Sequence, residues 1–404
     1  MTSFYRKNKK ILNLIPGLII LSLLVVGCAG PTFQGWSGLA SSDGLLYFGG
    51  IDGKVYAIST AARTQNLTFP SENEWVFSLP SGGVPGTVCG PACAPASASA
   101  GIYATPVVNG SVVCVATYGN SGKLVTINRI SPDYNKDDPK NKGQPQQSKG
   151  EWTYPSGNNS IGAIVGTPLL TDNTLYAGSS DGKLYALDST AYGKKIWEFD
   201  LGDKIWTSPV FKDGVIYISN YDKKLFAISS VGTQIWSTDL PASIASSPAI
   251  SADNIFVGAF DDSLYAIDRA TGKEKWKFEG GNWFWSTPIF SNNVVYAGCL
   301  DNKIYALDAA TGKELWQFTA NAAIAATPVL TNNLIVVASE VGDIYVLDST
   351  NGTLIRSILL GAPIKAPLLA DNDMVYVHAG NLCIYAINIQ SGEKAWEFCY
   401  SSAE

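Results

Sequence analysis

A short motif, Ser or Thr followed by Pro and two further residues that are mostly apolar, recurs through the chain at a nearly constant interval. Its clearest copies have prolines 41, 39, 40 and 40 residues apart: Thr167-Pro168, Ser208-Pro209, Ser247-Pro248, Thr287-Pro288 and Thr327-Pro328. The same phase leads back to Thr105-Pro106 and to two altered copies, Ser37-Gly38 and Ala366-Pro367. A fixed period of this length is typical of arrays in which each repeat is one unit packed against its neighbours. The sequence therefore predicts eight units.

Each unit has the pattern of four short strands. In the third unit, for example, the apolar stretches Thr174–Gly178 and Lys183–Asp188 flank the turn residues Asp181-Gly182, and a tryptophan strand follows. Asp, Asn and Gly tolerate the positive φ of tight hairpin turns, and no helical periodicity separates the strands. Four strands in about 40 residues form the blade of a propeller. We therefore expect an all-β fold over residues 37–404: an eight-bladed β-propeller of four-stranded antiparallel blades.

Tryptophans fall at one phase of the repeat. Seven units have one at the start of the last strand: Trp75, Trp152, Trp197, Trp236, Trp276, Trp316 and Trp396. The seventh unit has Arg356 instead. A large ring at a fixed position predicts a wedge that packs one blade against the next.

Two long inserts interrupt the period in the first two units. Residues 81–101 join the last strand of unit 1 to the first strand of unit 2, and residues 130–150 lie between the third and fourth strands of unit 2. Propeller connectivity sends these loops to opposite faces. Loops often carry specialised contacts, so this side of the disc is a candidate binding region.

The N-terminus has the pattern of a signal peptide. Four basic residues precede a 16-residue apolar run from Ile11 to Val26, which is shorter than the ~20 residues of a membrane-spanning helix. The run ends on Val25-Val26-Gly27-Cys28, which resembles a bacterial lipobox. The resemblance implies a signal peptide at 1–27, acylation of Cys28, a tether at 28–36 and an extracytoplasmic protein held at the cell membrane or outer membrane by its lipid.

Charge and composition exclude several other functions. Removal of residues 1–27 leaves 24 basic and 34 acidic residues, a net charge of −10, with no basic stripe for nucleic acid. The single histidine, His378, has no partner recognisable in the sequence and is interpreted as a structural or surface residue, so no metal site is expected. Two pairs of cysteines are candidate disulfides, Cys89 with Cys93 and Cys383 with Cys399.

The repeat resembles the tryptophan-docking motif of the quinoprotein propellers, Ala-x-Asp-x-x-x-Gly-x-x-x-Trp. Residues 306–316 and 266–276 match it fully, and residues 386–396 have Asn388 in place of Asp. One branch of this family comprises dehydrogenases that bind pyrroloquinoline quinone (PQQ) with calcium and a catalytic Asp. The other comprises cofactor-free, BamB-like propeller lipoproteins that scaffold outer-membrane assembly.

The residues favour the second branch. The inner-strand segments 242–247 and 322–327 are small and uncharged, and offer neither a base nor a cation for quinone chemistry. We therefore expect a monomeric, non-catalytic propeller without a cofactor that binds or scaffolds envelope proteins. A PQQ-dependent dehydrogenase and a carbohydrate- or peptide-binding surface lipoprotein remain the alternatives.

One aromatic group is a candidate contact site. Trp283, Phe284 and Trp285, with Trp206 at the same phase of an earlier unit, precede the Ser/Thr-Pro motif and so approach the mouth of the central channel. Exposed aromatic side chains there would bind a peptide or a planar ligand. Packing between blades is the alternative interpretation.

Overall fold

The structure is a computed structural model. It describes residues 37–61, 69–70, 74–79, 101–118, 122–129, 149–157, 159–244 and 246–400, with backbone alone at 149–150. Cys28, Cys89, Cys93 and most of the two inserts lie outside these residues. Among the described residues, no helix is long and apolar enough to cross a membrane.

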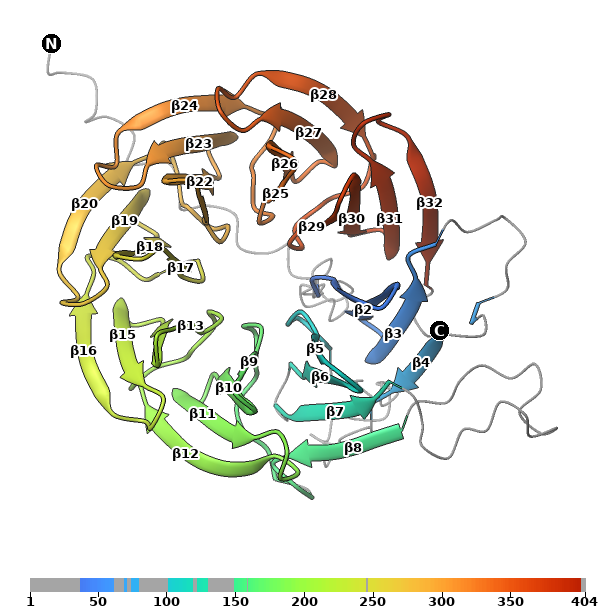
Figure 1. The fold of residues 1–404 in the computed structure, drawn as a ribbon, viewed down its shortest axis with the longest axis vertical. Helices are drawn as coiled ribbons and strands as arrows, with labels where there is room; N and C mark the ends of the chain where they lie inside the picture. Colours follow the sequence, from blue (N-terminus) through green and yellow to red (C-terminus); the bar gives the residue numbers. More distant parts are fainter. Residues whose placement is uncertain are drawn as a thin grey trace, which may run out of the picture. The chain divides into compact units, whose positions relative to one another are not determined.

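Eight four-stranded antiparallel sheets form a ring (Figure 1). Each sheet, or blade, uses four consecutive strands in the order in which they occur along the chain, and blades 1 to 8 follow one another around the ring. The prediction of an eight-bladed, all-β propeller is confirmed.

The strands occupy four equivalent positions in every blade. The first and innermost strands are β1 (Ala40–Ser42), β5 (Val107–Asn109), β9 (Leu169–Thr171), β13 (Val210–Lys212), β17 (Ala249–Ile250), β21 (Ile289–Ser291), β25 (Val329–Thr331) and β29 (Leu369–Asp371). The second strands are β2 (Leu45–Gly49), β6 (Val112–Ala116), β10 (Thr174–Gly178), β14 (Val215–Ser219), β18 (Asn254–Gly258), β22 (Val294–Gly298), β26 (Leu334–Ala338) and β30 (Met374–Ala379).

The third strands are β3 (Lys54–Ser59), β7 (Leu124–Asn128), β11 (Lys183–Asp188), β15 (Lys224–Ser229), β19 (Ser263–Asp268), β23 (Lys303–Asp308), β27 (Asp343–Asp348) and β31 (Cys383–Asn388). The outer strands are β4 (Trp75–Ser78), β8 (Lys149–Tyr154), β12 (Lys194–Asp200), β16 (Gln234–Asp239), β20 (Glu274–Glu279), β24 (Glu314–Thr319), β28 (Leu354–Leu359) and β32 (Lys394–Cys399).

Burial follows strand position. Second and third strands are buried along almost their whole length, as in β10 and β11, because neighbouring blades cover both faces of each sheet. In outer strands such as β24 most side chains are exposed, and towards the end of the strand exposed side chains alternate with buried or half-buried ones. The apolar cores therefore lie between blades, and each joins residues of two successive sheets.

The tryptophans pack across these boundaries. Trp276 in blade 5 donates its Nε1–H to the carbonyl of Ala309 in blade 6 at 3.1 Å, and its indole covers Gly312 of the same turn. Four further tryptophans make the equivalent bond to the carbonyl of the following blade: Trp197, Trp236, Trp316 and Trp396. Trp152 covers Gly193 in the same way, and Trp75 is fully buried. The predicted wedge position is thus an interblade contact.

Arg356 takes this place in blade 7. Its Nη2 donates to the carbonyl of Gln390 in blade 8 at 2.7 Å, and its side chain lies over Gly392. The guanidinium therefore replaces the indole donor at this one boundary.

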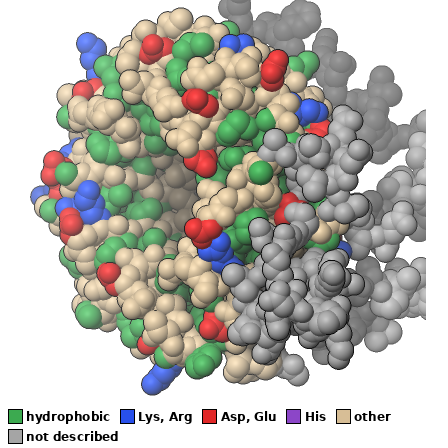
Figure 2. Space-filling view, turned by 45° about the vertical axis from the view of Figure 1, so that its right-hand side comes forward, with side chains coloured by type: hydrophobic (Ala, Val, Ile, Leu, Met, Phe, Trp, Pro, Cys, Tyr) green, Lys and Arg blue, Asp and Glu red, His purple; other side chains and the backbone are tan. Residues whose placement is uncertain are grey.

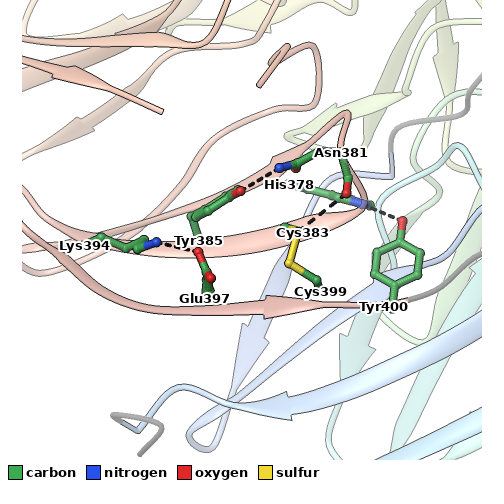
Figure 3. Close-up of a disulfide and its surroundings, with 8 residues drawn as sticks. All are labelled: His378, Asn381, Cys383, Tyr385, Lys394, Glu397, Cys399 and Tyr400. Carbon is green, nitrogen blue, oxygen red and sulfur yellow. Dashed lines mark hydrogen bonds and ion pairs between the residues drawn. A yellow bond between two sulfur atoms is a disulfide. The ribbon is translucent and has the colours of Figure 1, made fainter. Parts of the chain in front are cut away.

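The ring closes between blade 8 and blade 1 without exchange of a strand, because β1–β4 and β29–β32 form separate sheets. His378 lies at this seam, where its Nδ1 is hydrogen-bonded to the carbonyl of Ser37 at 2.8 Å. Its Nε2 is hydrogen-bonded to the Tyr400 hydroxyl at 2.8 Å (Figure 3). Burial lowers the pKa of His378 to about 4. His378 is therefore a buried structural residue with two partners that the sequence did not reveal.

A disulfide lies beside this seam. Cys383 on β31 and Cys399 on β32 are directly paired in the sheet register, and their sulfur atoms are bonded (Figure 3). The bond holds the last strand of the ring to its neighbour. The two cysteines without a disulfide among the described residues, Cys114 and Cys299, are buried.

Candidate functional site

A cavity of about 240 Å³ lies on the axis of the ring, where the Ser/Thr-Pro motifs of successive blades meet. Six hydroxyl residues of that motif line it: Thr105, Thr167, Ser208, Ser247, Thr287 and Thr327. In the space-filling view the described part of the protein is hollowed near its middle, with scattered charges around the hollow (Figure 2).

The hydroxyl groups of the motif connect neighbouring blades. The backbone N–H of Thr105 donates to Thr167 Oγ1 at 3.2 Å, that of Thr167 to Ser208 Oγ at 2.8 Å, and that of Ser208 to Ser247 Oγ at 2.8 Å. Each hydroxyl satisfies a backbone donor that would otherwise face the channel. The motif that defines the repeat therefore has a structural role at the axis.

Aromatic side chains gather at one mouth of this channel. Trp206, Tyr221, Phe260 and Trp285 line the cavity, and Trp283 packs on Phe260 with ring centroids 4.7 Å apart. We call these five residues the aromatic mouth. Ring contacts connect the group: Trp206 with Tyr221 at 4.9 Å, Tyr221 with Phe260 at 6.4 Å and Phe260 with Trp285 at 5.7 Å.

The connectivity of the blades places this group on one face. Trp206, Trp283 and Trp285 belong to the segments between an outer strand and the next inner strand, whereas Tyr221 and Phe260 belong to turns between second and third strands. In an antiparallel blade these two kinds of connection lie at the same end of the sheet. The three tryptophans are 42–46% exposed, so the mouth presents aromatic surface to solvent.

Phe284 does not belong to the mouth, and the prediction that it contacts a partner is wrong. It is fully buried and packs against Phe278 and Tyr305 at the boundary of blades 5 and 6. The repeat explains this position, because six other blades have a fully or almost fully buried Ile there: Ile102, Ile164, Ile205, Ile244, Ile324 and Ile364. Trp283 and Trp285, on either side, point away from the core.

Tyr221 and Phe260 were missed in the sequence because they lie in turns. Each directly precedes the turn Asp of its blade, Asp222 or Asp261. The signal that could have found them is the repeat itself, since both residues occupy the same turn position in adjacent blades.

Asp residues brace the turns between the second and third strands in several blades. In blade 6, Asp301 accepts the backbone N–H of Lys303 at 3.1 Å and the hydroxyl of Tyr305 at 2.6 Å. Burial and the hydrogen bond to Asp301 raise the pKa of Tyr305. Asp52, Asp181 and Asp261 make the same bond to Tyr56, Tyr185 and Tyr265. Of the two turns that contribute to the mouth, the blade 5 turn with Phe260 has this arrangement, through Asp261 and Tyr265.

The lining offers little for catalysis. Lys365 is the one charged side chain among the lining residues, and it pairs with Glu340 at 3.4 Å. Burial raises the pKa of the Cys114 and Cys299 thiols to about 12, which disfavours nucleophilic thiolates. The lining residues thus include one lysine, which is paired, and no carboxylate or histidine to act as a general base.

These residues do not fit PQQ with calcium. The quinone carboxylates need several cationic partners, and calcium needs carboxylate oxygens, whereas the cavity is lined by hydroxyl groups, aromatic rings and one paired lysine. The structure holds no group of three or more metal-binding side chains among its described residues.

The comparisons with known proteins agree with this fold. The family model for the outer membrane protein assembly factor BamB matches residues 142–237, 180–323 and 300–403, which together cover more than half of the chain. The chain belongs to this family. No curated protein matched in a sequence search.

Several solved structures are similar. BamB from Moraxella catarrhalis has a TM-score of 0.62 and 16% identity over 84% of this chain and 90% of its own. The computationally designed Ika8 protein has a TM-score of 0.61 and 16% identity over 85% and 96%. A quinohemoprotein alcohol dehydrogenase from Pseudomonas putida reaches a TM-score of 0.48, with 18% identity over 58% and 60%. At 16% identity, the first two similarities show a shared fold and say nothing about function. The TM-score of the third structure is too low to support a conclusion.

Proposed function

We propose that this protein is a lipid-anchored, non-catalytic propeller that binds or scaffolds proteins of the cell envelope through its aromatic mouth. One observation carries the proposal: three tryptophans, each more than 40% exposed, join Tyr221 and Phe260 in one patch at the channel mouth. Partly exposed aromatic clusters of this kind are typical centres of protein interfaces. Membership of the BamB family supports an assembly role at the outer membrane.

The anchor is the second part of the proposal. Residues 1–27 act as the signal peptide, Cys28 carries the lipid, and residues 28–36 connect it to the propeller. Several acyl chains hold a protein firmly at a membrane, since each buried methylene contributes about 0.8 kcal/mol. The protein would thus work outside the cytoplasm as a monomeric propeller.

Capture of partners from crosslinked membranes tests the binding role. The tagged full-length protein should recover a reproducible set of envelope proteins. The double variant Trp206→Ala/Trp285→Ala should reduce that recovery about 30-fold, because loss of interface anchors costs about 2 kcal/mol or more. The matched control is Ile235→Ala, which removes an apolar side chain that is 52% exposed on outer strand β16. Equal recovery by wild type and the double variant would refute the assignment of the mouth.

A sugar ligand is the remaining alternative at this site, because tryptophans stand beside a ring of hydroxyl groups. Titration of intrinsic Trp fluorescence with soluble peptidoglycan fragments separates the two functions. If wild type shows saturable quenching and the Trp206→Ala/Trp285→Ala variant does not, the ligand of the mouth is a carbohydrate and not a protein.

A further inference from the structure

The outer strand of blade 7, β28, presents different side chains to solvent from the outer strands of most other blades. Each outer strand pairs with a third strand on one side, and its other backbone edge pairs with no strand among the described residues. β28 lies at the rim of the ring (Figure 1). Because the chain contains eight repeats, each residue of β28 can be compared with the residue at the equivalent position of another blade. The strand registers identify these equivalent positions.

Two positions of β28 have lost the polar residues found in other blades. Leu354 occupies the place of Lys195, Gln234, Glu274, Glu314 and Lys394. Leu359 occupies the place of Asp200, Asp239, Glu279, Thr319 and the disulfide-bonded Cys399. Charged side chains on edge strands normally prevent pairing with other chains. β28 lacks this protection.

The apolar surface continues into the adjoining turn. Leu354, Ile355 and Leu359 are 45%, 53% and 77% exposed, and Val341, 53% exposed, replaces the Asp of the blade 7 turn. The N–H of Leu360 donates to the carbonyl of Gly342 at 2.9 Å, which fixes the end of β28 beside that turn. We call Val341, Leu354, Ile355 and Leu359 the blade 7 edge.

The single charge of β28 does not protect it. The guanidinium of Arg356 binds the carbonyl of Gln390 on blade 8, and its side chain packs over Gly392. Outer strand β4 also lacks charged residues, but it has four residues and exposes one large apolar side chain, Val76 at 40%. The blade 7 edge is longer and has more exposed apolar side chains.

We propose that the blade 7 edge binds an extended segment of another protein, which pairs with β28 as a fifth strand. The free N–H and C=O groups of β28 provide the backbone hydrogen bonds, and the exposed Leu and Ile side chains select apolar residues at alternate positions of the segment. The segment carries no charge in its paired stretch. The inference rests on the proposed function in one respect, namely that the segment belongs to an envelope protein.

Charge and backbone chemistry distinguish this occupant from two others. A second copy of the chain would bring together two molecules that each have a net charge of −10 after removal of residues 1–27, and this repulsion opposes self-association. A lipid bilayer would leave the free edge groups of β28 without hydrogen-bond partners in hydrocarbon. An uncharged strand satisfies the edge groups and leaves no charge unpaired.

Peptide binding with hydrogen exchange tests the inference. The probe is a blocked, fluorescent peptide in which Val and Thr alternate over about nine residues, enough to span β28. We expect saturable binding to the full-length protein and slower amide exchange confined to residues 353–360. A peptide with Pro at alternate positions, which lacks those N–H donors, should not bind.

Variants of the edge and of other blades provide the matched comparison. The double variant Leu354→Glu/Leu359→Asp, which restores residues found in sister blades, should weaken peptide binding at least tenfold. The control Ile196→Glu/Ile235→Glu places two charges at side chains that are 54% and 52% exposed on β12 and β16, and should bind as wild type does. Thermal unfolding of both double variants should match wild type.

Four outcomes would overturn the inference. The first is unchanged peptide affinity in the edge variant, and the second is exchange protection that appears elsewhere on the propeller. The third is a concentration-dependent dimer in sedimentation velocity that the edge variant abolishes, which would make a second copy the occupant. The fourth is loss of binding to phosphatidylglycerol vesicles in the edge variant, which would make lipid the occupant. The mouth variant Trp206→Ala/Trp285→Ala should still bind the peptide, so failure of the edge and failure of the mouth are distinguishable.

Discussion

Replacement of Gly312 by Ala tests the interblade contact that the repeat encodes. Gly312 has a φ of +71°, and a Cβ added to it would lie 2.6 Å from Cδ2 of Trp276. The indole is only 8% exposed, and its Nε1–H is bonded to the carbonyl of Ala309. The ring therefore has little room to move without losing that bond.

The magnitude follows from two costs. A left-handed backbone costs a residue with a Cβ about 1–2 kcal/mol, and overpacking against a buried ring costs a further ~1–3 kcal/mol. We expect Gly312→Ala to lower the free energy of unfolding by about 2–5 kcal/mol in total. Gly202 is the control, because it has a φ of +86° and nothing within 4 Å of an added Cβ. Gly202→Ala should cost only the first ~1–2 kcal/mol.

Equilibrium urea denaturation followed by Trp fluorescence provides the measurement. A double-mutant cycle with Trp276→Ala isolates the contact: without the indole, Gly312→Ala should cost no more than Gly202→Ala does. Equal destabilisation by Gly312→Ala and Gly202→Ala in the wild-type background would refute the reasoning.

Three further predictions follow from the seam and the anchor. Because burial lowers the pKa of His378 to about 4 while the unfolded value is about 6.5, the unfolded state takes up the proton first. The contribution of His378 to stability is therefore constant above pH 6.5 and falls by about 3 kcal/mol as the pH decreases to about 4. Urea denaturation of wild type should show about 2 kcal/mol of this fall between pH 7 and 5, and that of His378→Gln should not. Reduction of the Cys383–Cys399 disulfide, whose cysteines are 16 residues apart, should lower the free energy of unfolding by about 3 kcal/mol. A denaturation midpoint that does not change with dithiothreitol, or that is the same in wild type and Cys383→Ser/Cys399→Ser, would contradict this prediction. Cys28→Ser should release the protein from the membrane fraction, and mass spectrometry of the wild-type N-terminus should detect acyl chains on Cys28; an unmodified, membrane-bound protein would contradict the anchor.

The repeat made the fold predictable because each unit repeats the same local signals. The phase of the Ser/Thr-Pro motif and of the tryptophans determines the number of blades and the side of each blade that faces the next. The same periodicity, applied to Phe284, would have placed it with the buried Ile205 and Ile324 rather than beside the exposed Trp285. That error came from treating three consecutive aromatic residues as one group.

The seam and the mouth were less accessible to sequence reasoning, because their contacts join distant residues. Ser37 and His378 are 341 residues apart, and no local pattern connects them. Tyr221 and Phe260 lie in turns, where aromatic residues give no signal of their own; their significance arises from contact with Trp206 and Trp283. Side-chain partners across blades therefore needed the structure.

Site-specific photocrosslinking in living cells tests the central claim most directly. A photoreactive amino acid replaces Trp285 at the aromatic mouth in one variant and Ile235 on outer strand β16 in a second, two positions that are 46% and 52% exposed. We predict a discrete adduct with an envelope protein from position 285 and none from position 235. No adduct at position 285, or the same adducts from both positions, would contradict a binding role for the mouth.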